Sequence, residues 1–361
     1  MPDAGIESLK EEAEEYFVCY IRGMRIGQLN LSKNVEKTEV AIRRITMEKL
    51  AYFFIDDVIW CLRDITRQKP LSLFDNPFMS ALKKAHDKYG LTVQLNLFYR
   101  TDFFYGSDEF TLSDVTDSYK SEWACNSDWL KLAFHAKQEF PDYPYVNADY
   151  EDVKADCESV LKEIRRFAGE ESIAYILVPH WLPISKDGCR ALYDCGVRIM
   201  SPSYGDRTAY NGDKSTLPYG HAARLLQNRK KETMLFTRAG KDLAIKKSIS
   251  SYNHLNSEQY QQVSFKMKCI IDKETKMGFK ALSGGPCLNL YKYDEIEPGF
   301  APLIGEEYIG FATHEQYFYS DYYDYQPEYA DKILLAAKIL HNNGYRFITA
   351  DEQIDRCYAE N

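Results

Sequence analysis

The chain has 361 residues, enough for one large barrel with an insertion or for two domains, and its hydrophobic content of 45% excludes wholesale disorder. Its net charge of −9 and the lack of a long basic run exclude a protein that follows a nucleic acid backbone. No segment is apolar over the length of a membrane span, and residues 1–17 do not resemble a signal peptide. Since the 9 cysteines include no C-x-x-C pair, we expect reduced thiols and a cytoplasmic protein.

Helical and strand patterns alternate along most of the chain, after a lead-in over residues 1–50 that includes a predicted helix at 5–20. The predicted strands are 51–57, 91–99, 130–135, 173–179, 197–200, 308–313 and 346–349, and the predicted helices are 76–89, 150–168, 187–195 and 327–342. This alternation is typical of a βα barrel or of an open α/β sheet.

The alternation is interrupted over residues 202–306, which are richer in Gly, Pro, Ser and Lys. One strand is predicted there, at 263–272, so we expect a partly β insert. The flanking segments, 51–201 and 307–361, are then expected to form the main fold. Because the insert leaves and re-enters the chain beside two strand ends, we expect it to cover the mouth of the barrel.

Two adjacent carboxylates, Asp56 and Asp57, follow the apolar run of the strand at 51–57, which we expect to be buried on both faces. An unpaired charge out of water costs several kcal/mol, so a metal ion or a catalytic role would explain the pair. The alternative is that these residues cap the next helix.

Histidines stand at the C-terminal ends of three other predicted strands: His135, His180 and His314. In βα barrels, residues after the C-terminal ends of the strands converge on one mouth, where the active site lies. His135 and Glu139 are four residues apart and would be neighbours on a helical turn. With Asp57 they would make a metal site of two carboxylates and one imidazole that leaves positions open for water. The alternative for Glu139 is a solvated charge on a helix.

The order of these motifs resembles the polysaccharide deacetylase (NodB-homology) family over residues 51–201 and 307–354. The resemblance rests on Asp-Asp after the first strand, His-x-x-x-Glu after the third, a Pro-His-Trp turn after the fourth, a histidine after a late strand, and the closing segment HNNGYRFITADE. It implies a fold of the α/β class, a distorted TIM-like (β/α)7 barrel, here with the insert added. It also implies a hydrolase that removes acetyl groups from sugars with one divalent metal ion, either zinc or manganese, cobalt or nickel.

The resemblance implies roles for individual residues as well. Asp56 would be the general base and His314 the general acid. Asp57 and His135 would be ligands of the metal ion.

The chain departs from the family pattern at three positions, one of which is the family's fourth motif, for which the segment Ser201–Asp206 (SPSYGD) gives no match. Glu139 stands where the family has its second metal histidine. The turn at 178–181 reads Val-Pro-His-Trp where the family has Arg-x-Pro-Tyr, so the arginine that orients the base is missing. We therefore expect a divergent member with different substrates or weakened activity.

Substrate contacts are expected from residues beside these motifs: His180, Trp181, Glu315 and Tyr317. The segment 315–325 contains five tyrosines and a phenylalanine. These rings form either a stacking platform for sugars or an aromatic loop packed against the insert. We expect a carbohydrate-like small molecule or an oligosaccharide as the ligand.

Two other functions remain open. A glycoside hydrolase or lyase could use carboxylates alone, from among Asp56, Asp57, Glu139 and Glu315, with about 5–9.5 Å between the acid and its partner. A carbohydrate-binding barrel without activity is favoured by the missing arginine and the altered histidine and opposed by the retained Asp56, Asp57 and His314.

Overall fold

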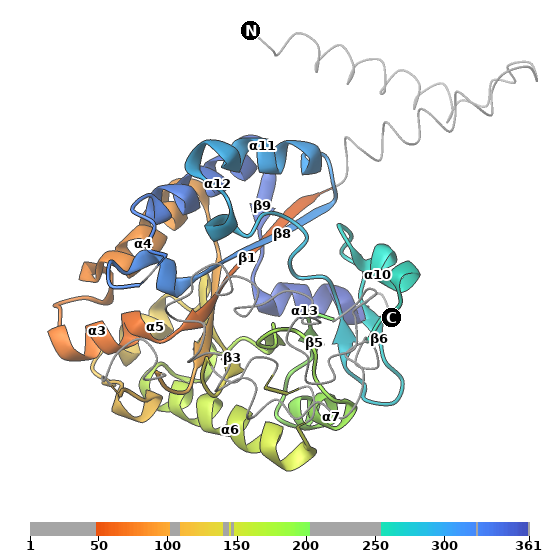
Figure 1. The fold of residues 1–361 in the computed structure, drawn as a ribbon, viewed down its shortest axis with the longest axis horizontal. Helices are drawn as coiled ribbons and strands as arrows, with labels where there is room; N and C mark the ends of the chain where they lie inside the picture. Colours follow the sequence, from red (N-terminus) through yellow and green to blue (C-terminus); the bar gives the residue numbers. More distant parts are fainter. Residues whose placement is uncertain are drawn as a thin grey trace, which may run out of the picture. The chain divides into compact units, whose positions relative to one another are not determined.

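The strands form two sheets with helices around them (Figure 1). The computed structural model describes residues 48–101, 109–139, 144–145, 148–202, 254–322 and 324–359. Lys49–Asn361 form one compact unit. The predicted helix at 5–20 and the first part of the predicted insert, 203–253, lie outside the described residues.

The first sheet is parallel and contains the long strands. Its order is β3 (Leu130–Ala136), β2 (Val93–Phe98), β1 (Lys49–Val58) and β8 (Tyr308–His314). β9 (Tyr345–Phe347) pairs with the start of β1, and β2 pairs with β1 from Phe54 onwards, so β9 and β2 share one edge of β1. β1 is therefore the centre of the sheet, as its buried apolar run predicts.

The second sheet has strands of two residues each, in the order β4 (Ile176–Leu177), β5 (Ile199–Met200), β7 (Gly278–Phe279) and β6 (Ile270–Ile271). β6 is antiparallel to β7, and the other pairs are parallel. Just before β4, the Ala174 N–H donates to the Leu132 carbonyl of β3 at 2.8 Å, which brings the edges of the two sheets together. The predicted α/β class with a parallel sheet is confirmed. The described strands make two sheets and no closed ring, so the predicted barrel closure is not seen among them.

Part of the predicted insert is built into the second sheet, because β7 pairs with β5. The strand predicted at 263–272 is wrong for most of its length. The helix α10 (Ser257–Val263) reaches its first residue, and only Ile270–Ile271 form a strand. The reason is that β7, the partner of β6, is itself two residues long, so the ladder cannot extend.

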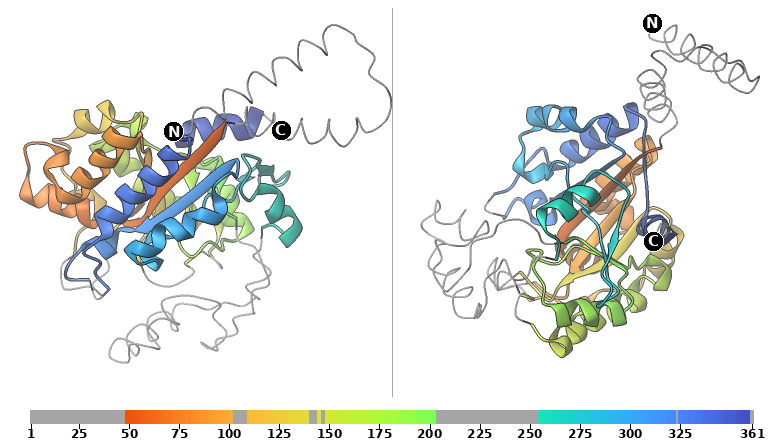
Figure 2. Two further views of the ribbon diagram at one scale, coloured as in Figure 1. Left: turned by 90° about the horizontal axis from the view of Figure 1, so that it is seen from above. Right: turned by 90° about the vertical axis from the view of Figure 1, so that its right-hand side faces the viewer.

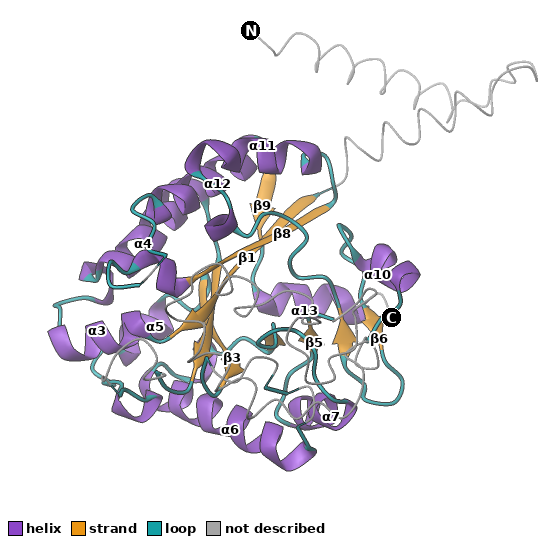
Figure 3. Cartoon of the chain, in the orientation of Figure 1, coloured by secondary structure: helices purple, strands orange, loops and turns teal. Residues whose placement is uncertain are grey.

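Helices cover the outside of the strands (Figure 3). They are α3 (Trp60–Gln68), α4 (Pro77–Tyr89), α5 (Lys120–Cys125), α6 (Tyr150–Phe167), α7 (Lys186–Asp194), α11 (Ile296–Phe300), α12 (Tyr329–Asn342) and α13 (Ala350–Ala359). As predicted, α4 ends at Gly90, whose φ of +69° is the left-handed conformation that glycine adopts without strain. α11 and α12 lie on one flank and α6 and α7 on the opposite flank, as the right-hand view of Figure 2 also shows.

β1 has two buried faces with different partners. One face packs against the helices and carries Ala51, Phe53 and Ile55. The other points between the two sheets and carries Leu50, Tyr52 and Phe54. Burial of each large apolar side chain contributes roughly 1.5–3 kcal/mol to folding stability, so this apolar interior face stabilises the fold. The next residue on the same face is Asp56.

In the described part of the chain, no helix combines the length and the apolar composition that crossing a bilayer requires. The eight cysteines found there form no disulfide with one another.

Candidate metal and acid–base site

The two adjacent carboxylates of β1 turn into the same cavity. Alternation along a strand would place Asp56 and Asp57 on opposite faces. Asp57 instead has a left-handed φ of +63°, and the register with β2 shifts between Ile55 and Val58. This irregularity costs about 1–3 kcal/mol for a residue other than glycine. It lets both carboxylates line one cavity of about 310 Å³.

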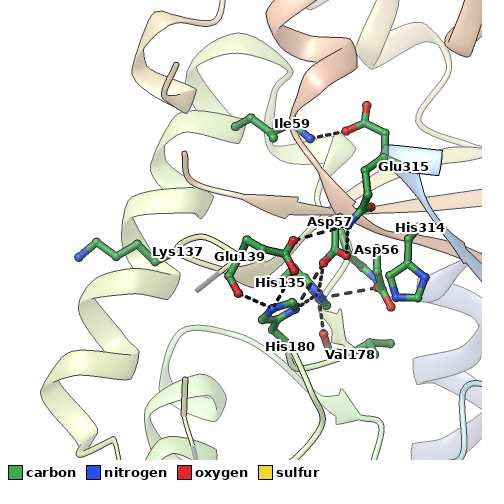
Figure 4. A network of polar contacts seen from close by, with 12 residues as sticks. Asp56, Asp57, Ile59, His135, Lys137, Glu139, Val178, His180, His314 and Glu315 are labelled. Carbon is green, nitrogen blue, oxygen red and sulfur yellow. Dashed lines mark hydrogen bonds and ion pairs between the residues drawn. The ribbon is translucent and has the colours of Figure 1, made fainter. Parts of the chain in front are cut away.

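Three buried donor atoms meet at this cavity (Figure 4). Asp57, His135 and His180 each offer one ligand atom, and these atoms lie within 4.8 Å of one another. Nε2 of His135 is 3.1 Å from Oδ1 of Asp57 and 3.1 Å from Nδ1 of His180. Nδ1 of His180 is 3.3 Å from the same carboxylate oxygen. His135 lies in β3 and His180 in the turn after β4, so the donor set joins three distant parts of the chain.

Backbone carbonyls fix which nitrogen of each imidazole carries a proton. Nδ1 of His135 is 2.7 Å from the Val178 oxygen, and Nε2 of His180 is 2.9 Å from the Glu139 backbone oxygen. A carbonyl oxygen can only accept, so these nitrogens are donors, and the opposite nitrogens, Nε2 of His135 and Nδ1 of His180, face Asp57. At this distance a carboxylate and two imidazole lone pairs repel one another unless a proton on His135 or a metal cation lies among them. The residues therefore fit a divalent metal ion of the kind that imidazoles and carboxylates bind.

The charges around the cavity also favour a cation. Asp56, Asp57 and Glu139 are buried, and none of the described residues that line the cavity is a lysine or an arginine. Burial opposes ionisation of Asp57, but hydrogen bonds with His135 and then His180 outweigh it and hold the pKa of Asp57 well below its usual range. Burial also disfavours the charged form of His135, but Asp56 and then Asp57 outweigh it and raise the pKa of His135 to about 8.

Asp56 lies between polar groups of the two neighbouring strands. On β2, the Asn96 amide Nδ2 donates to Oδ1 of Asp56 at 2.6 Å. On β8, His314 is the register partner of Asp56. Burial raises the pKa of Asp56, and the imidazoles of His135 and His314 offset part of this shift. Asp56 is therefore a better proton acceptor than an exposed aspartate.

His314 lies on the opposite side of Asp56 from His135 and His180 (Figure 4). Its Nδ1 is 3.0 Å from Oδ1 of Asn289. Because an amide oxygen accepts, Nδ1 of His314 is the donor, and Nε2 is the nitrogen available to a substrate.

Glu139 is buried next to the donor set, but it does not share a helical turn with His135. β3 continues through His135, and residues 137–139 form no helix, so that expectation is wrong. Oε1 of Glu139 lies 4.0 Å from Nε2 of His180. His180, which we expected at the substrate, stands in the donor set with Asp57 and His135. Ligation by Glu139 stays a prediction.

Glu315 is turned away from the cavity. Its carboxylate is fully buried and accepts the backbone N–H groups of Ile59, Trp60 and Cys61 at 2.7–2.8 Å. These are the unpaired donors at the start of α3, where Ile59 offers no capping side chain. Burial raises the pKa of Glu315 to about 7, and the three N–H groups oppose this shift. The structure therefore gives Glu315 a capping role in place of the expected substrate contact.

Aromatic side chains form another part of the cavity wall. Trp181 and Tyr317, both expected at the substrate, line it together with Tyr260 and Tyr322. Trp181 has a φ of +64° in a turn closed by the Leu182 N–H, which donates to the Pro179 oxygen at 2.7 Å. A positive φ at this turn position is normally taken by glycine, so Trp181 is held in a strained conformation beside the site.

Three amides that hold the site were not among the predicted site residues: Asn96, Asn289 and Gln316. Nε2 of Gln316 donates to Oδ2 of Asp57 at 2.8 Å. Amides carry no charge, so a search for titratable residues overlooks them. A signal exists for Asn96, because Gln94 and Asn96 are polar residues at alternate positions of a strand that is buried throughout.

No family model matches the sequence, and no curated protein matches it. Among solved structures, a 4-alpha-glucanotransferase from Thermococcus litoralis aligns with 86% of this chain at 9% identity and a TM-score of 0.48, and the chain spans only 40% of that protein. A family 4 acetyl xylan esterase from Clostridium thermocellum, in complex with a cobalt ion, aligns with 85% of this chain and 91% of its own at 12% identity and a TM-score of 0.36. The Xyl-CE4 domain of a multidomain xylanase from the hindgut metagenome of Trinervitermes trinervoides aligns with 86% of this chain and 91% of its own at 11% identity and a TM-score of 0.34. The chain is thus similar to family 4 carbohydrate esterases at low identity, and all three TM-scores lie below 0.5.

Proposed function

We propose that this protein is a metal-dependent hydrolase that removes an acyl group, such as acetyl, from a carbohydrate. One observation carries the proposal. Two imidazoles, each held by a backbone carbonyl through one nitrogen, turn the other nitrogen toward Asp57 in the same cavity that holds a second carboxylate, Asp56, and a third imidazole, His314. A three-ligand set beside a separate acid and base is the arrangement that metal-dependent hydrolysis requires.

Asp57, His135 and His180 are the metal ligands in this proposal, and Glu139 is a further candidate next to them. When bound there, a divalent metal ion supplies a Lewis acid that polarises the acyl carbonyl and makes water more acidic. Imidazole and carboxylate donors suit zinc, manganese, cobalt and nickel.

Asp56 acts as the general base. Its Oδ1 accepts from Asn96, which leaves Oδ2 to take a proton from the water that attacks the acyl carbon. The raised pKa of Asp56, caused by burial, suits this role because it strengthens the carboxylate as a base.

His314 acts as the general acid. Asn289 holds Nδ1, so Nε2 of the protonated imidazole delivers the proton to the leaving nitrogen or oxygen as the carbon–nitrogen or carbon–oxygen bond breaks. The products are a carboxylic acid and the deacylated sugar. Trp181 and Tyr317 are the rings on which a sugar would stack.

The test combines metal content and hydrolysis on the same preparations. We expect about one divalent ion per chain, and release of acetate from acetylated sugars that chelation stops and added metal restores. Cleavage of a glycoside that survives chelation would support the carboxylate-only glycosidase instead. Saturable sugar binding without turnover would support the binding barrel.

The same assay decides the place of Glu139. If Glu139 is a ligand, Glu139→Gln lowers metal affinity about 10- to 100-fold. Unchanged affinity would restrict the ligand set to Asp57, His135 and His180. Glu163→Gln, at a buried carboxylate on α6 paired with Arg166, is a matched control outside the cavity.

A further inference from the structure

A chain of buried polar side chains leads through the interior to Asp56. It consists of Tyr52 on β1 and Gln94 and Asn96 on β2, which are 2%, 1% and 0% exposed. The Tyr52 hydroxyl contacts Oε1 of Gln94, and Nε2 of Gln94 is 2.6 Å from Oδ1 of Asn96. Nδ2 of Asn96 is 2.6 Å from Oδ1 of Asp56. These contacts lie on the interior face of the sheet, which is otherwise apolar, and a buried polar group left without a hydrogen bond there costs about 1–3 kcal/mol.

One backbone carbonyl fixes the direction of every bond in this chain. Gln94 also places Nε2 3.0 Å from the Ile176 oxygen of β4, an atom that can only accept. Nε2 must therefore face both Ile176 and Asn96, so Oε1 must face Tyr52. The Asn96 oxygen then meets a donor, and its Nδ2 is left to face Asp56. The opposite orientation of either amide would set oxygen against oxygen.

We propose that Gln94 and Asn96 are positioning residues that form a relay of amides with a single hydrogen-bond direction. The Ile176 carbonyl orients Gln94, Gln94 orients Asn96, and Asn96 donates to Oδ1 of Asp56. Oδ2 of Asp56 is thereby kept for the reaction. The relay rests on the proposed role of Asp56 as general base. A neutral amide orients the carboxylate without the charge of a lysine or arginine, which would weaken it as a base. Tyr52 lies at the end of the chain of side chains away from Asp56. The orientation of the Gln94 amide does not depend on Tyr52, because the Ile176 carbonyl already fixes that orientation.

Three substitutions test the relay by steady-state hydrolysis of an acetylated sugar. Asn96→Leu removes the donor to Asp56 and should lower kcat about 10- to 100-fold with KM changed less than about threefold. Gln94→Glu replaces the donor by a carboxylate, which in its ionised form only accepts, so Asn96 must then turn its amide toward residue 94 and its oxygen toward Asp56. We expect a loss as large as that of Asn96→Leu, although position 94 does not touch Asp56. Tyr52→Phe should change kcat less than about threefold.

A double variant decides whether Gln94 acts through Asn96. If it does, combining Gln94→Glu with Asn96→Leu lowers kcat no further than Asn96→Leu alone. Additive losses would overturn the relay, as would a Gln94→Glu enzyme with the kcat of the wild type. Melting temperature and metal content are measured on every variant, so that a folding defect is not counted as a positioning effect.

A second measurement needs no activity. The side-chain NH2 signals of Asn96, assigned by their loss in Asn96→Leu, should be protected from solvent exchange. They should shift in Asp56→Asn and Gln94→Glu and stay in place in Tyr52→Phe. If no acylated sugar is hydrolysed but these signals behave as expected, the proposed function fails, while the hydrogen-bond order from Ile176 through Gln94 and Asn96 to Asp56 stands. If the wild type is active but the Asn96 side-chain signals do not shift in Gln94→Glu, the relay fails and the proposed function stands.

Discussion

Asp56 and Asp57 are neighbours in the sequence but lie on two sides of the site with opposite surroundings. We call the part with Asp57, His135 and His180 the metal side, and the part with Asp56 and His314 the acid–base side. On the metal side, hydrogen bonds with two imidazoles overcome burial and keep the pKa of Asp57 low. On the acid–base side, burial prevails and raises the pKa of Asp56, whose hydrogen-bond donor is the neutral amide of Asn96. One cavity thus makes one carboxylate a permanent charge suited to a cation and the next a proton acceptor.

The imidazoles are held in contrasting ways as well. Backbone carbonyls hold His135 and His180, so the metal side is set by the course of β3 and of the turn after β4. Side-chain amides hold Asp56 and His314. Single substitutions should therefore be able to disable the acid–base side while the metal side persists.

The largest effect is expected from Asp57→Ala, which removes the carboxylate that both imidazoles face. Metal content should fall to background and hydrolysis should fall about 1,000-fold or more, because the metal contributes several kcal/mol to the barrier. His180→Ala should lose the metal too. If His180→Ala instead kept the metal and only raised KM, His180 would be a substrate residue, as the sequence analysis expected.

Asp56→Asn should disable the acid–base side alone. General base catalysis contributes about 10²- to 10⁴-fold, so kcat should fall by this factor while metal content, measured by elemental analysis, stays at the wild-type level. Loss of the metal together with activity would contradict the separation of the two sides.

His314→Gln should have a smaller effect that depends on the leaving group. An acetylated amine or alkyl alcohol needs a proton to leave, so its hydrolysis should slow about 100-fold or more. A 4-nitrophenyl ester has a stable leaving anion, and its hydrolysis should slow much less. Equal losses on both substrates would show that His314 is not the general acid.

Glu315→Gln should leave kcat within about threefold of the wild type, because the Glu315 side chain faces the start of α3 and does not line the cavity. Its effect should be on stability and should depend on pH. Burial raises the pKa of Glu315 from 4.5 to about 7, so between these values the folded state binds a proton that the unfolded state does not. The unfolding free energy of the wild type, measured relative to the variant, should therefore fall by about 3 kcal/mol as the pH rises through this window and then level off. If Glu315→Gln lost activity with unchanged stability, Glu315 would be a substrate-binding residue, as the sequence predicts, and not a helix cap.

Local patterns in the sequence were enough for much of the fold. The apolar run of β1, the cap and glycine that bound α4, and the amphipathic pattern of α6 each depend on residues close together in the chain. For the same reason the sequence could place Asp56 and Asp57 at the end of a strand. The strand at 263–272 failed because its length depends on a partner, β7, that no local pattern reveals.

The composition of the site was decided by the tertiary structure. The left-handed conformation of Asp57 brings two adjacent carboxylates into one cavity, against the alternation of a strand. His180 joins Asp57 and His135 because β3 and β4 lie side by side, and Asn96 reaches Asp56 across two paired strands. The sequence determined which residues end the strands, since that depends on near neighbours. Which of them meet depends on how distant strands pair and where the backbone departs from regular geometry, and only the folded chain fixes both.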